Sequence, residues 1–299
     1  MSDVAVVIVS HNSRDDLERS LPVVCAGERQ VIVVDNASTD GTPAFTHKQF
    51  PHVDFLELRE NIGYGAACNQ GIARASAELV LLLNPDAWPV EDGIERLLRC
   101  AQRQPGLGAV GPELRAPDGA KQPSLVPFPT RWWLGRPAIT SAHSRIPLIR
   151  LPRLRSDSKF LVGAALLVRR EAFEQIGGFD PSFFMFYEEV DLCWRFHEAG
   201  WGVASCPEAK FIHVGGTSTR RNWAAMYREQ LLGHLRFLAK HRGSADAEHA
   251  RRLLARAVRM RAWAASGKEA EALRATGGWL MSADAMALIG RSTPRRESQ

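Results

Sequence analysis

Short apolar runs that end in polar corners are the feature that most constrains the fold of this chain. The clearest run, Leu79–Leu83, leads directly into Asn84-Pro85-Asp86. An apolar run of this length between turn residues is typical of a strand buried on both faces of a parallel sheet. Because proline has no N–H to donate, Pro85 ends the strand and leaves Asp86 in the corner. Ligands of open α/β sheets bind at such corners, and an Asp that only terminates the strand is the alternative.

The same pattern repeats along the first half of the chain, where helical segments separate the apolar runs. Strands of this kind, joined by helices, predict βαβ units and a mostly parallel, mixed sheet in an α/β fold. Strands are expected at 4–9, 30–34, 53–58, 79–83 and 107–110, and later at 159–168, 201–206 and 210–214.

Two regions depart from this alternation. Residues 113–158 are rich in proline and arginine and contain Trp132 and Trp133, so we expect an irregular insertion with a binding role, such as an acceptor or lid region, in preference to disorder. Residues 221–299 have a helical pattern rich in Ala, Leu and Arg. The chain is therefore divided into an α/β domain at 1–220 and a basic helical region at 221–299.

The C-terminal part of the chain carries most of the positive charge. Residues 220–299 contain 16 Lys+Arg and 7 Asp+Glu, a net charge of +9 within a chain of net charge +5. Within 249–265, apolar residues recur at helical spacing between arginines; they are Leu253, Leu254, Ala257 and Val258. Such a basic amphipathic helix suits peripheral contact with a membrane surface, a second subunit in a homodimer, or packing on the catalytic domain.

Composition limits the cellular compartments and the classes of partner that we expect for this chain. With 45% hydrophobic and 24% charged residues, the chain is typical of globular proteins. It has no apolar stretch near the roughly 20 residues that span a bilayer and no recognisable signal peptide. Its five cysteines are scattered, which indicates a reducing compartment and argues against a disulfide framework or a zinc knuckle. We expect a cytoplasmic protein, with peripheral contact at the inner face of the membrane, and no nucleic-acid partner.

Acidic residues at predicted strand ends are the candidates for chemistry. Asp35 and Asp86 follow strands, and Glu188 and Glu189 follow an aromatic run. Apolar surroundings and a neighbouring like charge raise carboxyl pKa values, which suits a general base, although acids in the first turn of a helix are the structural alternative. Asp86 and His213 could together hold a hard divalent ion whose shell a substrate diphosphate completes, whereas a lone histidine is more often structural.

Two nucleotide-binding motifs are absent or incomplete. Gly63-Tyr64-Gly65 has Cys68 where the third glycine of the dinucleotide fingerprint would stand, and no phosphate-binding P-loop motif occurs. This argues against a dinucleotide-dependent oxidoreductase and excludes a P-loop enzyme.

Taken together, these stretches resemble the inverting, metal-dependent family-2 glycosyltransferases of GT-A fold, and among them the rhamnosyltransferase-like branch. The resemblance spans roughly residues 4–216. The matching segments, all in the family's order, are 7–12, 33–42, 60–71, 82–86, 177–180, 186–195 and His213 with its following glycines. Each segment alone is weakly specific, whereas the seven together are strongly so.

The resemblance implies roles for particular residues. Asp35 would hold the base or ribose, Asn61 and the glycine loop would close on the nucleotide, Asp86 and His213 would bind Mg²⁺ or Mn²⁺, and Glu189 would be the catalytic base. Asn84 replaces the first Asp of the D-x-D signature, and Glu189 stands where Asp is more usual, so Glu188 is the alternative base. The full set of expected nucleotide-sugar-binding residues is Ser10, Asn12, Asp35, Asn61, Gly63, Asn69, Asn84 and Asp86.

The function implied by the resemblance is transfer of a sugar, with inversion, from a nucleotide diphosphate to a hydroxyl of a glycan or lipid-linked acceptor in cell-surface polysaccharide synthesis. The expected donor is dTDP-rhamnose, with UDP sugars as the alternative. Two other classes are considered: a non-catalytic nucleotide-sugar-binding module, and the dinucleotide-dependent oxidoreductase disfavoured above.

Overall fold

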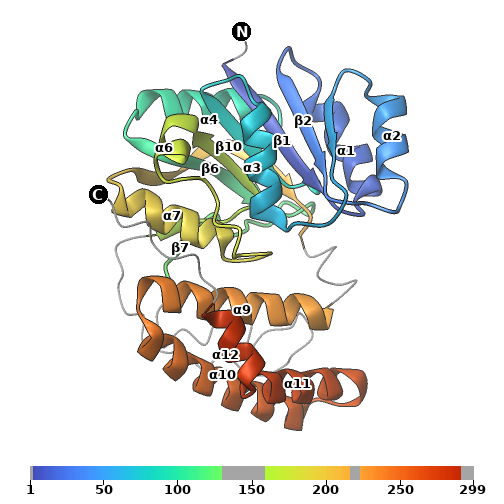
Figure 1. Ribbon diagram of the computed structural model, residues 1–299. Helices are drawn as coiled ribbons and strands as arrows, with labels where there is room; N and C mark the ends of the chain where they lie inside the picture. The colour runs from blue at the N-terminus through green and yellow to red at the C-terminus, as the bar shows by residue number, and fades with distance from the viewer. Residues whose placement is uncertain (1–2, 130–158, 216–222, 291–299) are drawn as a thin grey trace. The chain divides into compact units, whose positions relative to one another are not determined.

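The computed structural model describes residues 3–129, 159–215 and 223–290 (Figure 1). These residues form two compact units. The described residues of the first unit are 3–127, 159–181 and 188–215, and those of the second are 128–129, 182–187 and 223–290.

The first unit is built on an eight-stranded sheet of order β3-β2-β1-β4-β9-β6-β10-β5. β9 runs antiparallel to β4 and β6, and β5 runs antiparallel to β10, whereas the other neighbours are parallel. The strands are β1 (Val4–Ser10), β2 (Gln30–Asp35), β3 (Asp54–Glu57), β4 (Leu79–Leu83), β5 (Ala87–Pro89), β6 (Leu107–Arg115), β9 (Ala165–Arg169) and β10 (Gly202–His213). This architecture confirms the predicted α/β fold with a mixed, mostly parallel sheet.

Helices cover both faces of this sheet, so its central strands are apolar on both sides. In β1, Val6 and Ile8 share one core with Leu21 of α1, while Val7 of the opposite face lies against Gly71 of α3. Every residue of β1 and β4 is buried, which explains why these strands are continuous apolar runs in the sequence. The helices of this unit are α1 (Arg14–Val24), α2 (Thr42–Gln49), α3 (Tyr64–Arg74), α4 (Gly93–Arg103), α6 (Arg170–Gln175) and α7 (Glu188–Glu198).

The later strands differ from the sequence predictions. Residues 159–168 do not form one strand: β8 (Lys159–Leu161) pairs with β7 (Leu125–Pro127) in a separate two-stranded sheet, and β9 begins after a break. Conversely, the predicted strands 201–206 and 210–214 lie, apart from their outer residues Trp201 and Val214, in the single strand β10, whose pairing with β6 shifts between Cys206 and Lys210. The predicted irregular insertion at 113–158 is partly regular, because β6 extends to Arg115 and β7 follows. Its tryptophans, Trp132 and Trp133, lie outside the described residues.

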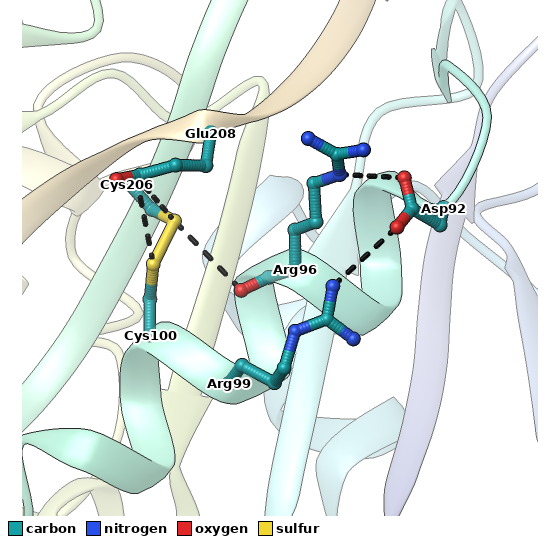
Figure 2. The surroundings of a disulfide bond; sticks show 6 residues. All are labelled: Asp92, Arg96, Arg99, Cys100, Cys206 and Glu208. Atoms are coloured by element: carbon teal, nitrogen blue, oxygen red, sulfur yellow. Dashed lines mark hydrogen bonds and ion pairs between the residues drawn. A yellow bond between two sulfur atoms is a disulfide. The ribbon is translucent and has the colours of Figure 1, made fainter.

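A disulfide bond joins Cys100 of α4 to Cys206 of β10 (Figure 2). The scattered cysteines argue against a disulfide framework, and this single bond is not expected from them. The two residues are 106 positions apart, and the packing of α4 on β10 brings them together, which cysteine spacing alone does not reveal. Glu208 places a carboxylate oxygen 3.5 Å from the Cys206 sulfur.

The second unit contains four described helices that pack on one another through apolar residues such as Leu235, Leu254 and Val258 (Figure 1). They are α9 (Trp223–His241), α10 (Ser244–Ala264), α11 (Gly267–Leu280) and α12 (Ala283–Ile289). The helical pattern expected after residue 221 is thus present. Within the described ranges, no helix has the length and apolar character needed to cross a bilayer.

A strained corner in the second unit precedes α7. Phe186 (φ 65°) and Tyr187 (φ 72°) are consecutive non-glycine residues with left-handed backbone, a conformation that persists only where surrounding contacts hold it. The buried Tyr187 ring lies 5.5 Å from the His234 ring of α9, and Arg236 donates a hydrogen bond to the Ser182 carbonyl. A Cβ on Gly233 would lie 2.7 Å from the Phe186 carbonyl oxygen, so α9 needs glycine there.

We expect Gly233→Ala to lower the free energy of unfolding by about 1–3 kcal/mol, because the added methyl group overpacks this contact. Gly278→Ala is the matched control: a methyl group added to this glycine of α11 would have no atom within 4 Å, so alanine should be neutral or stabilise by about 0.5–1 kcal/mol. Urea unfolding followed by circular dichroism measures both. Equal stability of the two variants would contradict the close contact.

Candidate active site

The carboxyl ends of β1, β2 and β4 meet at one edge of the sheet, because these neighbouring strands are parallel. Ser10 is paired with Asp35 at the ends of β1 and β2. Next to them, β4 ends at Leu83 and the chain turns, with the Ala87 N–H donating to the Asn84 carbonyl at 3.1 Å. The polar corners predicted from the sequence therefore lie along one edge.

Ser10 and Asp35 present oxygen atoms that are not used by the described part of the protein. Both side chains are fully buried, and neither Ser10 Oγ nor Asp35 Oδ1 has a hydrogen-bond partner among the described residues. The other oxygen, Asp35 Oδ2, accepts from the Ser38 N–H at 2.9 Å, which fixes the orientation of the carboxylate. A buried polar atom without a partner is costly, so this pair suits a ligand that supplies hydrogen bonds.

The asparagines near this pair shape the loops around it. Asn12 (φ 52°) accepts from the Thr39 N–H through its side-chain oxygen at 2.8 Å. Asn61 Oδ1 accepts from the Gly63 N–H at 3.0 Å and from Asn36 Nδ2 at 2.9 Å. Gly63 (φ 87°) then precedes α3 as its N-cap, with a backbone conformation that favours glycine. These residues hold the two loops that border Ser10 and Asp35.

Asn69 and Asn84 differ from each other in how their side chains are used. Asn69 donates to the Phe179 carbonyl and accepts from the Phe179 N–H, both at 2.9 Å, so its amide is committed to holding that backbone. Any contribution of Asn69 to nucleotide binding is thus through the position of Phe179. The half-buried Asn84 side chain makes no hydrogen bond within the described residues and is available at the end of β4.

Asp86 and His213 lie together because β5 and β10 pair in antiparallel fashion, with Ala87 opposite His213. Asp86 Oδ1 is 3.6 Å from His213 Nε2, and Asp86 Oδ2 accepts from the Gly215 N–H at 2.9 Å. His213 Nδ1 lies 2.9 Å from Gln122 Oε1, and Gln122 Nε2 donates to the His213 carbonyl at 2.9 Å. Since the second bond fixes the amide orientation, Nδ1 carries the proton and Nε2 is left with a lone pair facing Asp86.

This arrangement fits a divalent cation. Burial lowers the pKa of His213 and outweighs the opposing effect of Asp86, which favours the neutral imidazole that metal ions require. Two electron-rich atoms, Asp86 Oδ1 and His213 Nε2, then face each other without a proton between them. Gln122 orients the imidazole as hydrogen-bond partners of metal-binding histidines do. Sequence reasoning did not find Gln122, because it lies in the proline-rich stretch and carries no motif.

Glu188 and Glu189 begin α7 and have different surroundings. Burial, and then the charge of Glu189, raise the pKa of Glu188 well above its usual range, which favours the neutral acid. Glu189 is only half-buried, and a Cβ on Gly163 would lie 3.5 Å from its side chain. Gly163 directly precedes Ala164, whose carbonyl accepts from the Asn84 N–H at 3.0 Å. Glu189 therefore lies beside the edge at which β4 ends.

The family model for "Glycosyl transferase family 2" matches residues 5–177, a range that contains β1 to β4 and their polar corners. The chain belongs to glycosyl transferase family 2. It is a glycosyltransferase, and the dinucleotide-dependent oxidoreductase alternative is therefore wrong. The GT-A-like architecture agrees with this membership.

Two curated relatives of this family-2 enzyme are named as glycosyltransferases. It is 37% identical over 247 residues, covering 75% of this chain and 80% of the relative, to an N-acetylglucosaminyl-diphospho-decaprenol L-rhamnosyltransferase of Mycobacterium tuberculosis. It is 27% identical over 248 residues, covering 81% of this chain and 76% of the relative, to the low-salt glycan biosynthesis hexosyltransferase Agl10 of Haloferax volcanii. The chain is thus a rhamnosyltransferase-like member of the family.

Solved structures support the fold. A mannosyltransferase from Pyrobaculum calidifontis, in complex with GDP-Man and Mn²⁺, superposes with a TM-score of 0.57 at 20% identity, over 96% of this chain and 83% of the other. TarS residues 1–349 from S. aureus superpose with a TM-score of 0.52 at 14% identity, over 93% of this chain and 89% of the other. At these identities, the similarity concerns the fold.

We expect Gln122→Leu to weaken Mn²⁺ binding about 10- to 100-fold, because the imidazole of His213 loses the acceptor that orients it. Calorimetric titration of Mn²⁺ in the presence of a nucleoside diphosphate measures the affinity. The matched control is Gln102→Leu, which removes an exposed glutamine of α4. If the two variants bound Mn²⁺ equally well, Gln122 would have no part in the metal site.

Proposed function

We propose that this family-2 glycosyltransferase moves L-rhamnose from dTDP-rhamnose to a hydroxyl of a lipid-linked glycan acceptor, with inversion at the anomeric carbon and with Mg²⁺ or Mn²⁺ as cofactor. The observation that carries the proposal is the 3.6 Å approach of Asp86 Oδ1 to His213 Nε2, with the unused oxygens of Ser10 and Asp35 at the ends of β1 and β2. The sugar and the acceptor are suggested by the Mycobacterium tuberculosis relative, which is named for both.

Binding of the donor is assigned to the first two strand ends. Asp35 Oδ1 would accept hydrogen bonds from the ribose or base, and Ser10 Oγ would add a second polar contact. The loops held by Asn12 and Asn61 border this position, and Gly63 caps the N-terminus of α3, whose first N–H groups favour negative charge. The nucleotide would thus lie along the edge of β1 and β2, with its diphosphate toward the end of β4.

Asp86 and His213 would hold the cation through Asp86 Oδ1 and His213 Nε2, while Asn84 stands two residues before Asp86 with an unused amide. When bound, the cation would neutralise charge on the departing diphosphate. Only two protein ligands are available there among the described residues, so diphosphate oxygens would have to complete its shell.

Glu189 is assigned the role of general base. It would remove the proton of the acceptor hydroxyl as that oxygen attacks the anomeric carbon from the face opposite the leaving group. Its partial exposure suits this contact with an acceptor. Burial raises the pKa of Glu188 well above its usual range, past the moderate rise that suits a general base, and the neutral acid that results is poorly suited to accept a proton.

The donor assignment is tested by incubating the purified chain with Mn²⁺ and dTDP-rhamnose, UDP-glucose or GDP-mannose, and measuring release of the nucleoside diphosphate. We expect slow release of dTDP from dTDP-rhamnose only, abolished by a chelator and by Asp86→Ala. Preference for UDP-glucose would overturn the choice of donor and leave the transferase activity standing. Nucleotide binding without release of any diphosphate, even with a lipid-linked acceptor, would instead favour a binding module.

For the base, Glu189→Gln should lower kcat by about 10²- to 10⁴-fold, because an amide of the same shape cannot accept the proton. The affinity for dTDP-rhamnose, measured by calorimetry, should stay within a few-fold of the unmodified chain. Glu188→Gln is the matched control: the raised pKa of Glu188 already favours the neutral acid, which an amide resembles, so kcat should change little. A dead Glu188→Gln together with an active Glu189→Gln would reverse the two roles.

A further inference from the structure

The outer face of α10 is the strongest feature that the proposed activity does not use. Its exposed side chains recur every three to four residues and therefore share one side of the helix. They are His249, Arg252, Arg256, Arg259, Met260 and Trp263, named here the α10 stripe. The apolar residues emphasised in the sequence face the other way: Leu254 and Val258 are buried within the helical unit, and Leu253 and Ala257 are half-buried. The expected amphipathic helix exists, but its apolar face is already covered.

The α10 stripe exposes two large apolar side chains near its C-terminal end. Trp263 is 91% exposed and Met260, one turn earlier, is 73% exposed. Single exposed apolar residues are ordinary, whereas an exposed indole and an exposed thioether one helical turn apart, among arginines, form a small apolar patch with a cationic border. Tryptophan has a particular preference for the membrane–water interface, where its ring lies at headgroup level.

The arginines of α10 fall into two groups. Arg251 and Arg261 are buried and pair with Glu248 and Glu269, at 2.6 and 2.8 Å respectively. By contrast, Arg256 and Arg259 are exposed and make no ion pair among the described residues, and only Arg252 of the stripe shares Glu248.

The stripe itself contains no acidic residue, so its positive charge is largely uncompensated. It lies in the region of the chain that carries the net charge of +9.

We propose that the α10 stripe docks on the surface of an anionic phospholipid bilayer, with Arg252, Arg256 and Arg259 against lipid phosphates and with Met260 and Trp263 inserted at headgroup level. Charge complementarity favours this partner, because an anionic leaflet attracts clustered arginines without any spanning helix. The purpose of docking rests on the proposed lipid-linked acceptor, whereas the docking itself does not depend on it.

A second copy of the chain fits the same surface less well. In a two-fold symmetric dimer the same patch lies on both sides of the interface, so Arg256 and Arg259 of one protomer would approach those of its partner. Few acidic groups are at hand to offset them, since Glu248 already serves Arg251 and Arg252. A bilayer supplies phosphates and a soft apolar layer together, which matches both parts of the stripe.

The test is co-sedimentation of the full chain with vesicles of phosphatidylglycerol and phosphatidylcholine, or of phosphatidylcholine alone, at low and high salt. We expect pelleting with the anionic vesicles at low salt that decreases at high salt, since salt screens such contacts. Arg256→Glu with Arg259→Glu should lower the partition coefficient by at least about 30-fold, given the known contribution of each basic residue near an anionic surface. Trp263→Ser should weaken binding several-fold at both salt concentrations.

Two controls separate local docking from general effects. Lys48→Glu with Arg103→Glu changes the net charge by the same amount at exposed positions of the first unit, and Met286→Ser removes a methionine that is 55% exposed on α12. Both should pellet like the unmodified chain. Equal losses in these controls, unchanged pelleting of the arginine variant, or no pelleting of the unmodified chain would overturn the proposal.

Light scattering measures whether the chain dimerises. If Trp263→Ser abolished a dimer without altering pelleting, the proposal would be overturned and the α10 stripe assigned to contact with a second copy. Release of dTDP from dTDP-rhamnose in solution should be unaffected in all these variants. A variant that no longer pellets but still releases dTDP therefore tests only the docking proposal. Absence of dTDP release in every variant, and in the unmodified chain, would count only against the proposed function.

Discussion

The antiparallel pairing of β5 with β10 is the constraint on which the candidate site depends. Asp86 belongs to a corner early in the chain, and His213 ends a strand formed much later; only the Ala87–His213 register brings them to 3.6 Å. The same pairing directs the Gly215 N–H to one oxygen of Asp86 and leaves the other facing the imidazole. A small strand of three residues therefore converts a strand-terminating aspartate into half of a pair that suits a metal ion.

Around that pair, some polar side chains support neighbouring backbone, and others leave polar atoms unused within the described protein. Asn12, Asn61 and Asn69 use their amides on neighbouring backbone, and Gln122 uses both ends of its amide on His213. Such interactions restrict side-chain and loop motion before any ligand arrives, so less entropy is lost on binding. Ser10 and Asp35 differ from these residues, because Ser10 Oγ and Asp35 Oδ1 are buried and have no hydrogen-bond partner in the described protein. Rigid support and unsatisfied atoms together explain how an edge of a sheet can be selective for a polar ligand.

Local sequence pattern predicts those parts of the structure that depend on neighbouring residues. The apolar runs at β1, β2 and β4 and the polar corners after them follow from burial on both faces of a sheet, and the structure confirms them. Long-range pairing is not predictable in this way. The break between β8 and β9, the continuity of β10, the Cys100–Cys206 bond and the contact of Gln122 with His213 all depend on segments far apart in sequence. The apolar face of α10 shows the same limit, since periodicity reveals a face without revealing what covers it.

The corner at Phe186 and Tyr187 has a strained backbone that lowers stability directly before the start of α7. Left-handed backbone costs about 1–2 kcal/mol for each non-glycine residue, and the chain keeps two in succession immediately before the helix that begins with Glu188 and Glu189. Asparagine in place of the half-buried Phe186 would relieve part of this cost, whereas at position 187 it would also remove the buried Tyr187 ring and lose more than it relieves. The packing of that ring therefore holds a strained backbone in place at the residue directly before α7.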